Sequence, residues 1–314
     1  MKKIIALAVA SAFVTPAFAA DVTVGGEIEY YYTAVDGGDS SVVDNDNLIK
    51  VTAAEELPNG MSIKATMNVY SDTPSSGGST LGNDGTNIAL SGAFGTINVG
   101  DVTGAMDATG DYTDISPSGG GFSGDGYDSS IRWDLPTVVE GLTVRVSHNP
   151  EGANNTGAGN NNASTTDASG FSLTYDFGDA AVYYASEELN GVIIGQDSGA
   201  AAEDMKNVAY GIKYSMGGLY VAYETMTSNP DLAASGDDTE ATGVAVSYKM
   251  GDVVIGGEQQ EVKQGSDDAY TDISNVFVEY NLGSNVDLYI VQQDNDGSAS
   301  TAADETRVGI EYNF

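Results

Sequence analysis

The regular alternation of polar and apolar residues is the feature that most constrains the fold of this chain. Beyond residue 20, most of the sequence divides into segments of roughly 9–11 residues in which apolar side chains take every second position. Successive side chains of a strand point to opposite faces, so each segment is predicted to be a strand with one apolar and one polar face. Sixteen such segments lie near 22–35, 46–57, 61–71, 86–91, 96–103, 129–135, 142–148, 168–177, 180–189, 206–215, 219–228, 240–250, 253–263, 271–282, 286–294 and 305–314.

The connections between these segments alternate strictly between long and short. Seven are tight turns, at 57–60, 91–95, 136–141, 177–179, 216–218, 250–252 and 283–285. Eight are longer and rich in Asp, Gly, Ser, Thr and Asn, at 36–45, 72–85, 104–128, 149–167, 190–205, 229–239, 264–270 and 295–304. This alternation predicts an all-β fold: a 16-stranded antiparallel transmembrane β-barrel with short periplasmic turns, long extracellular loops and both termini in the periplasm. A soluble all-β sandwich has no reason to alternate its loop lengths in this way.

The first nineteen residues have the features of a secretory signal peptide. Lys2 and Lys3 precede the apolar stretch Ile4–Val14, which is too short to span a bilayer as a helix, and Ala17-Phe18-Ala19 matches the small-x-small cleavage pattern. We therefore expect residues 1–19 to be a signal peptide and residues 20–314 to form one barrel domain. No later apolar run approaches the length of a transmembrane helix.

Charge and composition exclude several function classes. Lys2 and Lys3 leave with the signal peptide, so 9 basic residues remain against 46 acidic ones, a net charge of −37 that argues against nucleic-acid binding. The chain has no cysteine and one histidine, His148, so disulfides, thiolate metal sites and multi-histidine sites are not expected. Ser147 and His148 are adjacent on a strand and point to opposite faces, so they do not make a nucleophile and base. We expect no enzyme activity, no cofactor and no dedicated metal site.

The phase of the alternation assigns side chains to the lipid or to the lumen. In the last segment, Val308, Ile310, Tyr312 and Phe314 share one face, which we place toward lipid. Outward aromatic residues recur beside the short turns, where membrane barrels carry an interfacial girdle. The predicted girdle residues are Trp133, Tyr175, Phe177, Tyr214, Tyr248, Tyr280, Tyr312 and Phe314.

The basic residues follow the opposite phase. Seven of the nine in the mature chain fall on the inward face: Lys50, Lys64, Arg132, Arg145, Lys213, Lys249 and Arg307. An Arg or Lys that faces lipid at the bilayer midplane costs about 2–4 kcal/mol, so a barrel would enforce this phase. Acidic residues also occupy inward positions, including Glu27, Glu29, Glu224, Glu279 and Glu311.

Four stretches resemble the trimeric general diffusion porins of Gram-negative outer membranes. Residues 20–26 (ADVTVGG) resemble the first strand of that family, and residues 90–100 (LSGAFGTINVG) its fourth strand, turn and fifth strand. Residues 128–136 (DSSIRWDLP) resemble its sixth strand. Residues 307–314 (RVGIEYNF) resemble its terminal strand, whose last aromatic residue is an assembly signal. The resemblance covers the whole mature chain, and the order and spacing of the stretches make it specific.

The resemblance implies that the third loop, about Gly104 to Asp128, folds into the barrel and constricts it. Its acidic residues Asp107, Asp111, Asp114, Asp125 and Asp128 would face a basic wall formed by Lys50, Lys64, Arg132 and Arg145. The chain departs from the family pattern at Asp101, where a basic residue is common, and near Ser116, where the usual Pro-Glu-Phe-type tip is not evident. The resemblance also implies a homotrimer, contact with lipid and lipopolysaccharide, and recognition of Phe314 by the barrel assembly machinery.

The function expected from these observations is passive diffusion of small hydrophilic solutes and ions across the outer membrane, with a preference for cations. Three alternatives remain open: a substrate-specific sugar or oligosaccharide porin, with Tyr31, Tyr70 and Tyr289 inward; an adhesin or structural barrel with a plugged lumen; and a soluble secreted protein. They predict, respectively, saturable conductance, no unitary conductance, and protein in the culture medium.

Overall fold

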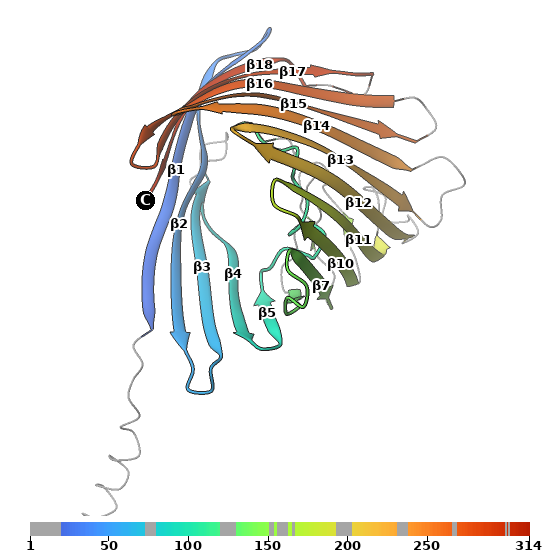
Figure 1. Ribbon diagram of the computed structural model, residues 1–314. Helices are drawn as coiled ribbons and strands as arrows, with labels where there is room; N and C mark the ends of the chain where they lie inside the picture. The colour runs from blue at the N-terminus through green and yellow to red at the C-terminus, as the bar shows by residue number, and fades with distance from the viewer. Residues whose placement is uncertain are drawn as a thin grey trace, which may run out of the picture.

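The protein is a closed antiparallel barrel of sixteen strands, as predicted (Figure 1). The computed structural model describes residues 20–72, 80–119, 130–150, 154–155, 163–164, 167–192, 203–230, 238–265, 269–298, 300 and 302–314. The predicted signal peptide 1–19 and the predicted constriction residues Asp125 and Asp128 lie outside these ranges. Within them, no helix is both long enough and apolar enough to cross a membrane.

Each barrel strand pairs with its neighbours in the chain, and the last pairs with the first. The strands are β1 (Asp21–Val35), β2 (Ser41–Glu56), β3 (Ser62–Asp72), β4 (Thr80–Gly92), β5 (Gly95–Gly100), β6 (Ser130–Asp134), β7 (Leu142–Asn149), β10 (Asp167–Asp176), β11 (Ala180–Val192), β12 (Glu203–Met216), β13 (Leu219–Pro230), β14 (Thr239–Met250), β15 (Val253–Gln264), β16 (Ala269–Gly283), β17 (Val286–Asp296) and β18 (Glu305–Asn313). Two further short strands, β8 (Asn154–Asn155) and β9 (Ala163–Ser164), pair with each other between β7 and β10.

The predicted segments match these strands except at a few ends. The segment predicted at 86–91 is longer, because β4 begins at Thr80, and β2 begins at Ser41 rather than residue 46. The segment predicted at 96–103 is shorter, because β5 ends at Gly100. Gly100 has a φ of 124°, which non-glycine residues rarely adopt, and the Asp101 N–H donates to the Thr86 carbonyl at 2.9 Å. The chain leaves the wall at this point.

The barrel closes where the two ends of the chain meet. The N–H of Gly26 donates to the Phe314 carbonyl at 2.9 Å, and the Phe314 N–H donates back to the Gly26 carbonyl at 3.0 Å. A Cβ on Gly26 would lie 2.7 Å from the Phe314 ring, so only glycine leaves room for this contact. Figure 1 shows the C-terminus beside β1.

The two faces of the wall differ as the alternation predicts. The outward face carries exposed apolar side chains such as Val246, Ile290 and Ile310. The inward face instead pairs aromatic rings with glycines of the next strand: Tyr183 covers Gly211, Phe277 covers Gly256 and Tyr289 covers Gly309. Such aromatic–glycine pairs let a strongly curved sheet fill its concave side.

Candidate functional site

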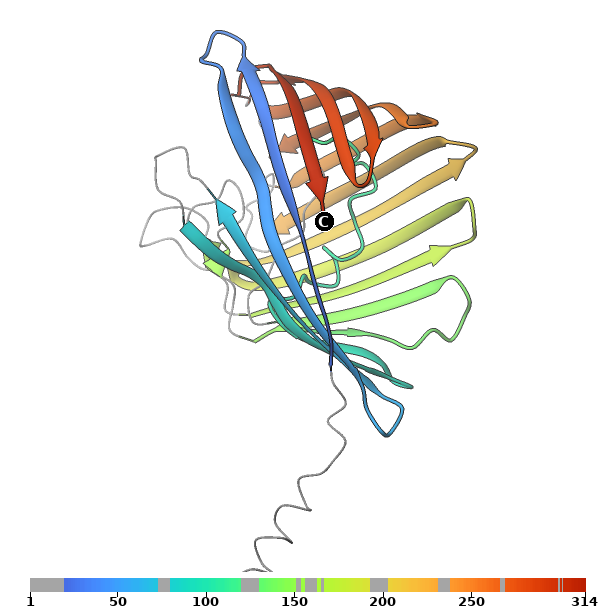
Figure 2. The ribbon, with the colours of Figure 1, turned by 90° about the vertical axis from the view of Figure 1, so that its left-hand side faces the viewer.

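The third loop follows β5, and its first nineteen residues, 101–119, enter the barrel and lie along its inner wall. Its described part, residues 101–119, appears as the teal stretch inside the ring of strands (Figure 2). Its contacts progress around the wall. The Ala105 N–H donates to Ser147 Oγ on β7 at 2.8 Å, and Arg307 Nη1 on β18 donates to the Ser118 carbonyl at 3.1 Å. The expectation that this loop folds inward agrees with this path.

Small residues on the wall make room for the loop. Ala181, Ala185, Ala209, Ala222 and Ala245 are buried on the inward faces of β11 to β14, where they form one cluster with Met106 and Tyr112 of the loop. Short side chains allow the loop backbone to approach the sheet closely, and burial of the two larger side chains stabilises it there.

The lumen-facing edge of the loop is acidic. Asp111 and Asp114 are exposed, whereas Asp107 is half-buried. Desolvation by the surrounding loop and wall, followed by the negative charges of Asp107, Glu224 and Asp114, raises the pKa of Asp111 to about 7. Asp111 also has a φ of 67°, a left-handed conformation that Asp tolerates better than most residues. The carboxylate therefore carries a partial and pH-dependent charge near neutrality.

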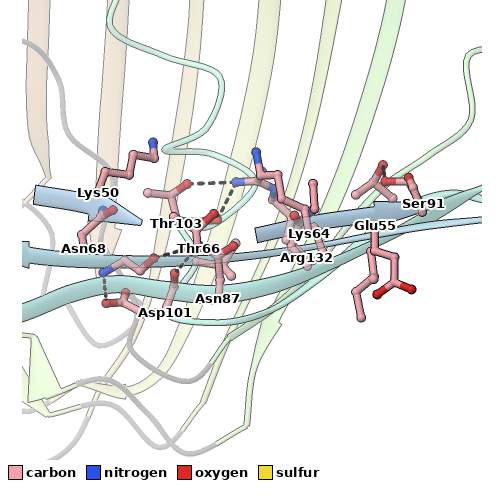
Figure 3. A pocket seen from close by; sticks show the side chains of 18 of the residues that line it. Lys50, Glu55, Lys64, Thr66, Asn68, Asn87, Ser91, Asp101, Thr103 and Arg132 are labelled. Carbon is pink, nitrogen blue, oxygen red and sulfur yellow. Dashed lines mark hydrogen bonds between the residues drawn. The ribbon is translucent and has the colours of Figure 1, made fainter. Parts of the chain in front are cut away.

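A cavity of about 890 Å³ lies between the start of the loop and the wall of β2 to β6. Lys50, Lys64 and Arg132 line it (Figure 3), together with the carboxylates of Asp21, Glu55, Glu56 and Asp101 and short polar side chains including Thr66, Asn87 and Asn98. Arg132 donates to the carbonyl and the hydroxyl of Thr103 at 3.0 and 2.9 Å, and its Nε lies 2.9 Å from Asp134 Oδ1. Lys50 and Lys64 are exposed, and no carboxylate of the described residues lies within 4.0 Å of either ammonium.

Arg145, like Arg132, bonds to the loop itself, but unlike Lys50, Lys64 and Arg132 it does not line the cavity. Its Nη1 donates to Thr109 of the loop at 3.0 Å, and its Nε lies 3.5 Å from Asp134. The cause is that β7 lies where the loop enters the barrel, so a long inward side chain at position 145 meets the loop itself. Arg145 supports the loop and does not face it across the lumen.

The eight predicted girdle residues all have exposed side chains. Trp133 Nε1 donates to the Phe94 carbonyl at 2.8 Å in the short turn between β4 and β5. The Tyr312 ring stacks on Phe314, and the Tyr175 ring lies tilted beside Phe177. The exposed set is Trp133, Tyr175, Phe177, Tyr214, Tyr248, Tyr280, Tyr312 and Phe314.

Several inward carboxylates do not face the open lumen. Glu29 is 4% exposed and accepts from the Tyr289 hydroxyl and from Asn45, and Glu224 is fully buried against the loop. Glu258, which the sequence analysis did not single out, is buried there too. The sequence could have placed Glu258 only by the alternation of its strand, which puts it on the same face as Val254 and Gly256.

The Ser147 and His148 side chains point to opposite faces. Ser147 is buried against the loop, whereas His148 is exposed on the outer face with Nδ1 at 3.1 Å from Ser169 Oγ. Within the described ranges, no group of three or more His, Cys, Asp or Glu side chains is arranged to hold a metal ion.

Comparison with known proteins identifies the family. A family model described as Gram-negative porin matches residues 6–300. The chain belongs to the Gram-negative porin family. It is an outer-membrane porin, and its barrel, its inward third loop and its outer-membrane location agree with the resemblance found in the sequence. No curated protein sequence matches the porin significantly.

Solved porins share the fold at low sequence identity. An anion-selective porin from Comamonas acidovorans is 16% identical, with a TM-score of 0.74 over 94% of this chain and 100% of that chain. Salmonella typhi OmpF in complex with daunomycin is 15% identical, with a TM-score of 0.73 over 94% of this chain and 98% of that chain. The trimer form of Vibrio cholerae OmpT is 15% identical, with a TM-score of 0.71 over 94% of this chain and 100% of that chain. At these identities the likeness establishes the fold alone.

Proposed function

We propose that this porin lets small hydrophilic solutes and ions diffuse passively across the outer membrane and that it prefers cations. The observation that carries the proposal is the exposed acidic edge of the third loop, with Asp111 and Asp114 inside the barrel of a chain with 46 acidic residues. Negative charge beside a low-dielectric wall raises the local cation concentration and excludes anions. Lys50 on β2 and Lys64 on β3 would face this edge across the lumen and give the constriction a transverse field.

Selectivity must come from these side chains, because the same fold serves an anion-selective porin in Comamonas acidovorans. The sugar-specific alternative needs accessible inward aromatic faces. Tyr289 is 4% exposed beneath Glu29, and Tyr31 lies beside Arg307, whose guanidinium carbon is 5.1 Å from the ring centroid. Tyr70, the third inward tyrosine, packs over Gly82 and is 36% exposed. Two of the three inward tyrosines are thus engaged by neighbouring side chains of the wall, which favours general diffusion.

Reversal potentials of the purified porin in a planar bilayer, measured in a KCl gradient, test the proposal. We expect a reversal potential whose sign corresponds to K⁺ preference and a conductance that does not saturate as the salt concentration rises. Sugars should enter the pore or be excluded from it according to their size alone. A zero or anion-selective reversal potential refutes the cation preference. Saturable block by one sugar would favour the substrate-specific alternative, and absence of unitary conductance would favour a plugged barrel.

We also propose that the functional form is a homotrimer associated through β1 to β3. From the end near the short turns to the middle of these strands, the outward positions carry aliphatic side chains such as Val22, Val24, Ile63 and Met67. The neighbouring strand β18 instead carries Tyr312, which Phe314 follows. β1 carries the exposed Tyr30 and Tyr32 toward its far end, whereas the half of the sector near the short turns has no outward aromatic residue on these strands. A surface without such residues needs no anchor to the bilayer surface if another subunit covers it. The trimer form of Vibrio cholerae OmpT offers a precedent within the fold.

The remaining partners follow from the position of the barrel. Residues 1–19 would direct export, and Phe314, at the closing seam, would be recognised by the barrel assembly machinery. The outer surface would contact lipid and lipopolysaccharide. Removal of Phe314 should reduce the amount of porin in outer-membrane fractions, and an unchanged amount would refute its role as an assembly signal.

A further inference from the structure

The third loop contains a short repeat of the form Asp-x-Ser/Thr. Three copies lie in one run: 107–109 (DAT), 111–113 (DYT) and 114–116 (DIS). A further match, 101–103 (DVT), lies apart at the start of the loop, where Thr103 is exposed and accepts from Arg132. In each copy of the run the third residue is buried, and in the last two copies the aspartate is exposed. The hydroxyls of the three copies bond to successive points of the wall: Ser172 on β10, Glu224 on β13 and Glu258 on β15. The repeat thus turns hydroxyls toward the wall and carboxylates toward the lumen.

Glu224 holds the second copy. Its Oε2 accepts from the Tyr112 N–H at 3.0 Å, and its Oε1 accepts from the Thr113 N–H at 3.1 Å and from the Thr113 hydroxyl. The Tyr183 hydroxyl also donates to Oε2 at 3.0 Å. The side chain is fully buried, so a carboxylate here is stabilised only by this complete set of donors.

Glu258 holds the third copy in the same way. Its Oε2 accepts from the N–H groups of Ile115 and Ser116 at 2.7 and 2.9 Å, and its Oε1 accepts from the Ser116 hydroxyl at 2.6 Å. Asn275 donates to Oε1 at 2.8 Å, whereas Tyr183 donates to Oε2 of Glu224. Two wall glutamates therefore bind two consecutive repeat units through the same set of loop donors, two N–H groups and one hydroxyl.

The spacing of the repeat matches the spacing of the strands. From Thr113 to Ser116 the loop advances three residues, and the wall partners advance two strands, from β13 to β15. From Thr109 to Thr113 the loop advances four residues, and the wall partners advance three strands, from β10 to β13. The additional residue, Gly110, accompanies the additional strand.

Tyr112 selects which copy binds which glutamate. Its ring meets Tyr183 edge-on at 4.9 Å and lies 4.3 Å from Lys213 Nζ, and its carbonyl accepts from the Tyr220 hydroxyl at 2.6 Å. Ile115, the equivalent residue of the next copy, offers no ring for these contacts. The loop is therefore held in one register along the wall.

We propose that Glu224 and Glu258 are positioning residues for ion selectivity, which grip successive Asp-x-Ser/Thr units and thereby aim Asp111 and Asp114 into the lumen. This inference rests on the proposed cation preference. Neither glutamate faces the solution itself, so each acts on permeating ions through the loop carboxylate it presents. A glutamine in either position keeps the shape but replaces one acceptor oxygen with a donor, which leaves loop N–H groups opposed by an NH₂ group.

Thiol labelling tests whether the loop depends on these glutamates. The chain has no cysteine, so Ala222→Cys provides a single thiol that lies beneath Met106 and Tyr112. A membrane-impermeant maleimide should label it slowly. Adding Glu224→Gln should raise the labelling rate about tenfold or more, since hydrogen bonds to a charged group are lost. Glu279→Gln is the matched control, because Glu279 is inward on β16 beside Asp287, Glu311 and Lys249, away from the loop contacts.

The reversal potential supplies the second readout. In the porin without the reporter thiol, Glu224→Gln should move it toward zero, in the same direction as Asp111→Asn. An unchanged labelling rate overturns the positioning role, and faster labelling with an unchanged reversal potential overturns the role in selectivity. If the wild-type porin shows no cation preference, the proposed function fails while the labelling rates still decide whether the glutamates hold the loop.

The second glutamate keeps the test decisive if Glu224→Gln does not assemble, as judged by heat-dependent mobility on gels. Val291→Cys places a thiol on β17 in the buried cluster against which Ile115 packs. Glu258→Gln should accelerate labelling there more than at Ala222→Cys, because it releases only the third repeat unit. Equal or absent acceleration at the two reporter positions contradicts the assignment of one glutamate to each unit.

Discussion

The titration of Asp111 offers the most specific prediction about selectivity. Its pKa is raised to about 7, by desolvation first and then by Asp107, Glu224 and Asp114. The carboxyl should be about 10% ionised at pH 6 and about 90% ionised at pH 8. Because a raised pKa keeps the proton on at lower pH, the lumen gains negative charge as the pH rises. The K⁺/Cl⁻ permeability ratio should therefore increase from pH 6 to pH 8, with a midpoint near 7.

The magnitude follows from the charge and its distance to the ion path. A unit charge acts on an ion about 10 Å away in water with about 0.4 kcal/mol, which changes the local concentration of each ion about two-fold in opposite directions. Since about 0.8 of a charge is gained from pH 6 to pH 8, the permeability ratio should change about three-fold without added salt and about 1.5-fold near 0.1 M, where screening over a Debye length of about 10 Å applies. Bilayer reversal potentials at pH 6, 7 and 8 measure it. Asp111→Asn should abolish the step, and a step of equal size and midpoint in that variant would refute the assignment.

Three further predictions concern the wall. Lys64→Glu should increase the K⁺/Cl⁻ permeability ratio at least two-fold by Coulomb effects in the lumen. Lys206, which is exposed near the outer end of β12, is the control, and Lys206→Glu should change the ratio little. Equal effects of the two substitutions would contradict a special role for the cavity wall. Gly309→Ala places a Cβ 2.1 Å from the Tyr289 ring and should lower the free energy of unfolding in lipid vesicles by about 1–3 kcal/mol. Gly257→Ala, whose Cβ comes no closer than 3.1 Å to any neighbouring atom, should lower that free energy less. The reverse order would argue against the aromatic–glycine packing. Met67→Arg on the outer face of β3 should remove the trimer band on unheated gels. Val246→Arg on the outer face of β14 is the control and should retain the trimer band of the folded protein. A trimer that survives in the Met67→Arg variant would exclude β1 to β3 as the interface.

The barrel was predictable because the membrane imposes a simple rule on every strand. Each residue faces either hydrocarbon or the interior, and the phase of Val308, Ile310 and Tyr312 in the last strand follows directly from that rule. Loop lengths then gave the topology. Strand ends were harder, because local turn chemistry decides them: β5 stops at Gly100 through one left-handed glycine and one hydrogen bond to Thr86.

The interior of the site was less predictable, since its partners are distant in sequence. Phase placed Glu224 inward but did not distinguish a carboxylate facing water from one bonded to the loop, and the Tyr112 N–H it accepts lies 112 residues away. The Asp-x-Ser/Thr repeat is visible in the sequence, yet it acquires meaning only when the wall supplies acceptors at matching intervals. Arg145 and Tyr289 were likewise given the correct face, and only packing showed that each is engaged by the wall or the loop.

The claim that the acidic loop lies in the ion path has a direct test. In this cysteine-free chain, Asp114→Cys places a thiol at the exposed edge of the loop, and Asp39→Cys places one at the exposed turn between β1 and β2. A cationic thiol reagent added during single-channel recording should reduce the current of Asp114→Cys channels in discrete steps and lower their K⁺ preference, and should leave Asp39→Cys channels nearly unchanged. Complete labelling of the Asp114→Cys thiol with no change in current would contradict the account.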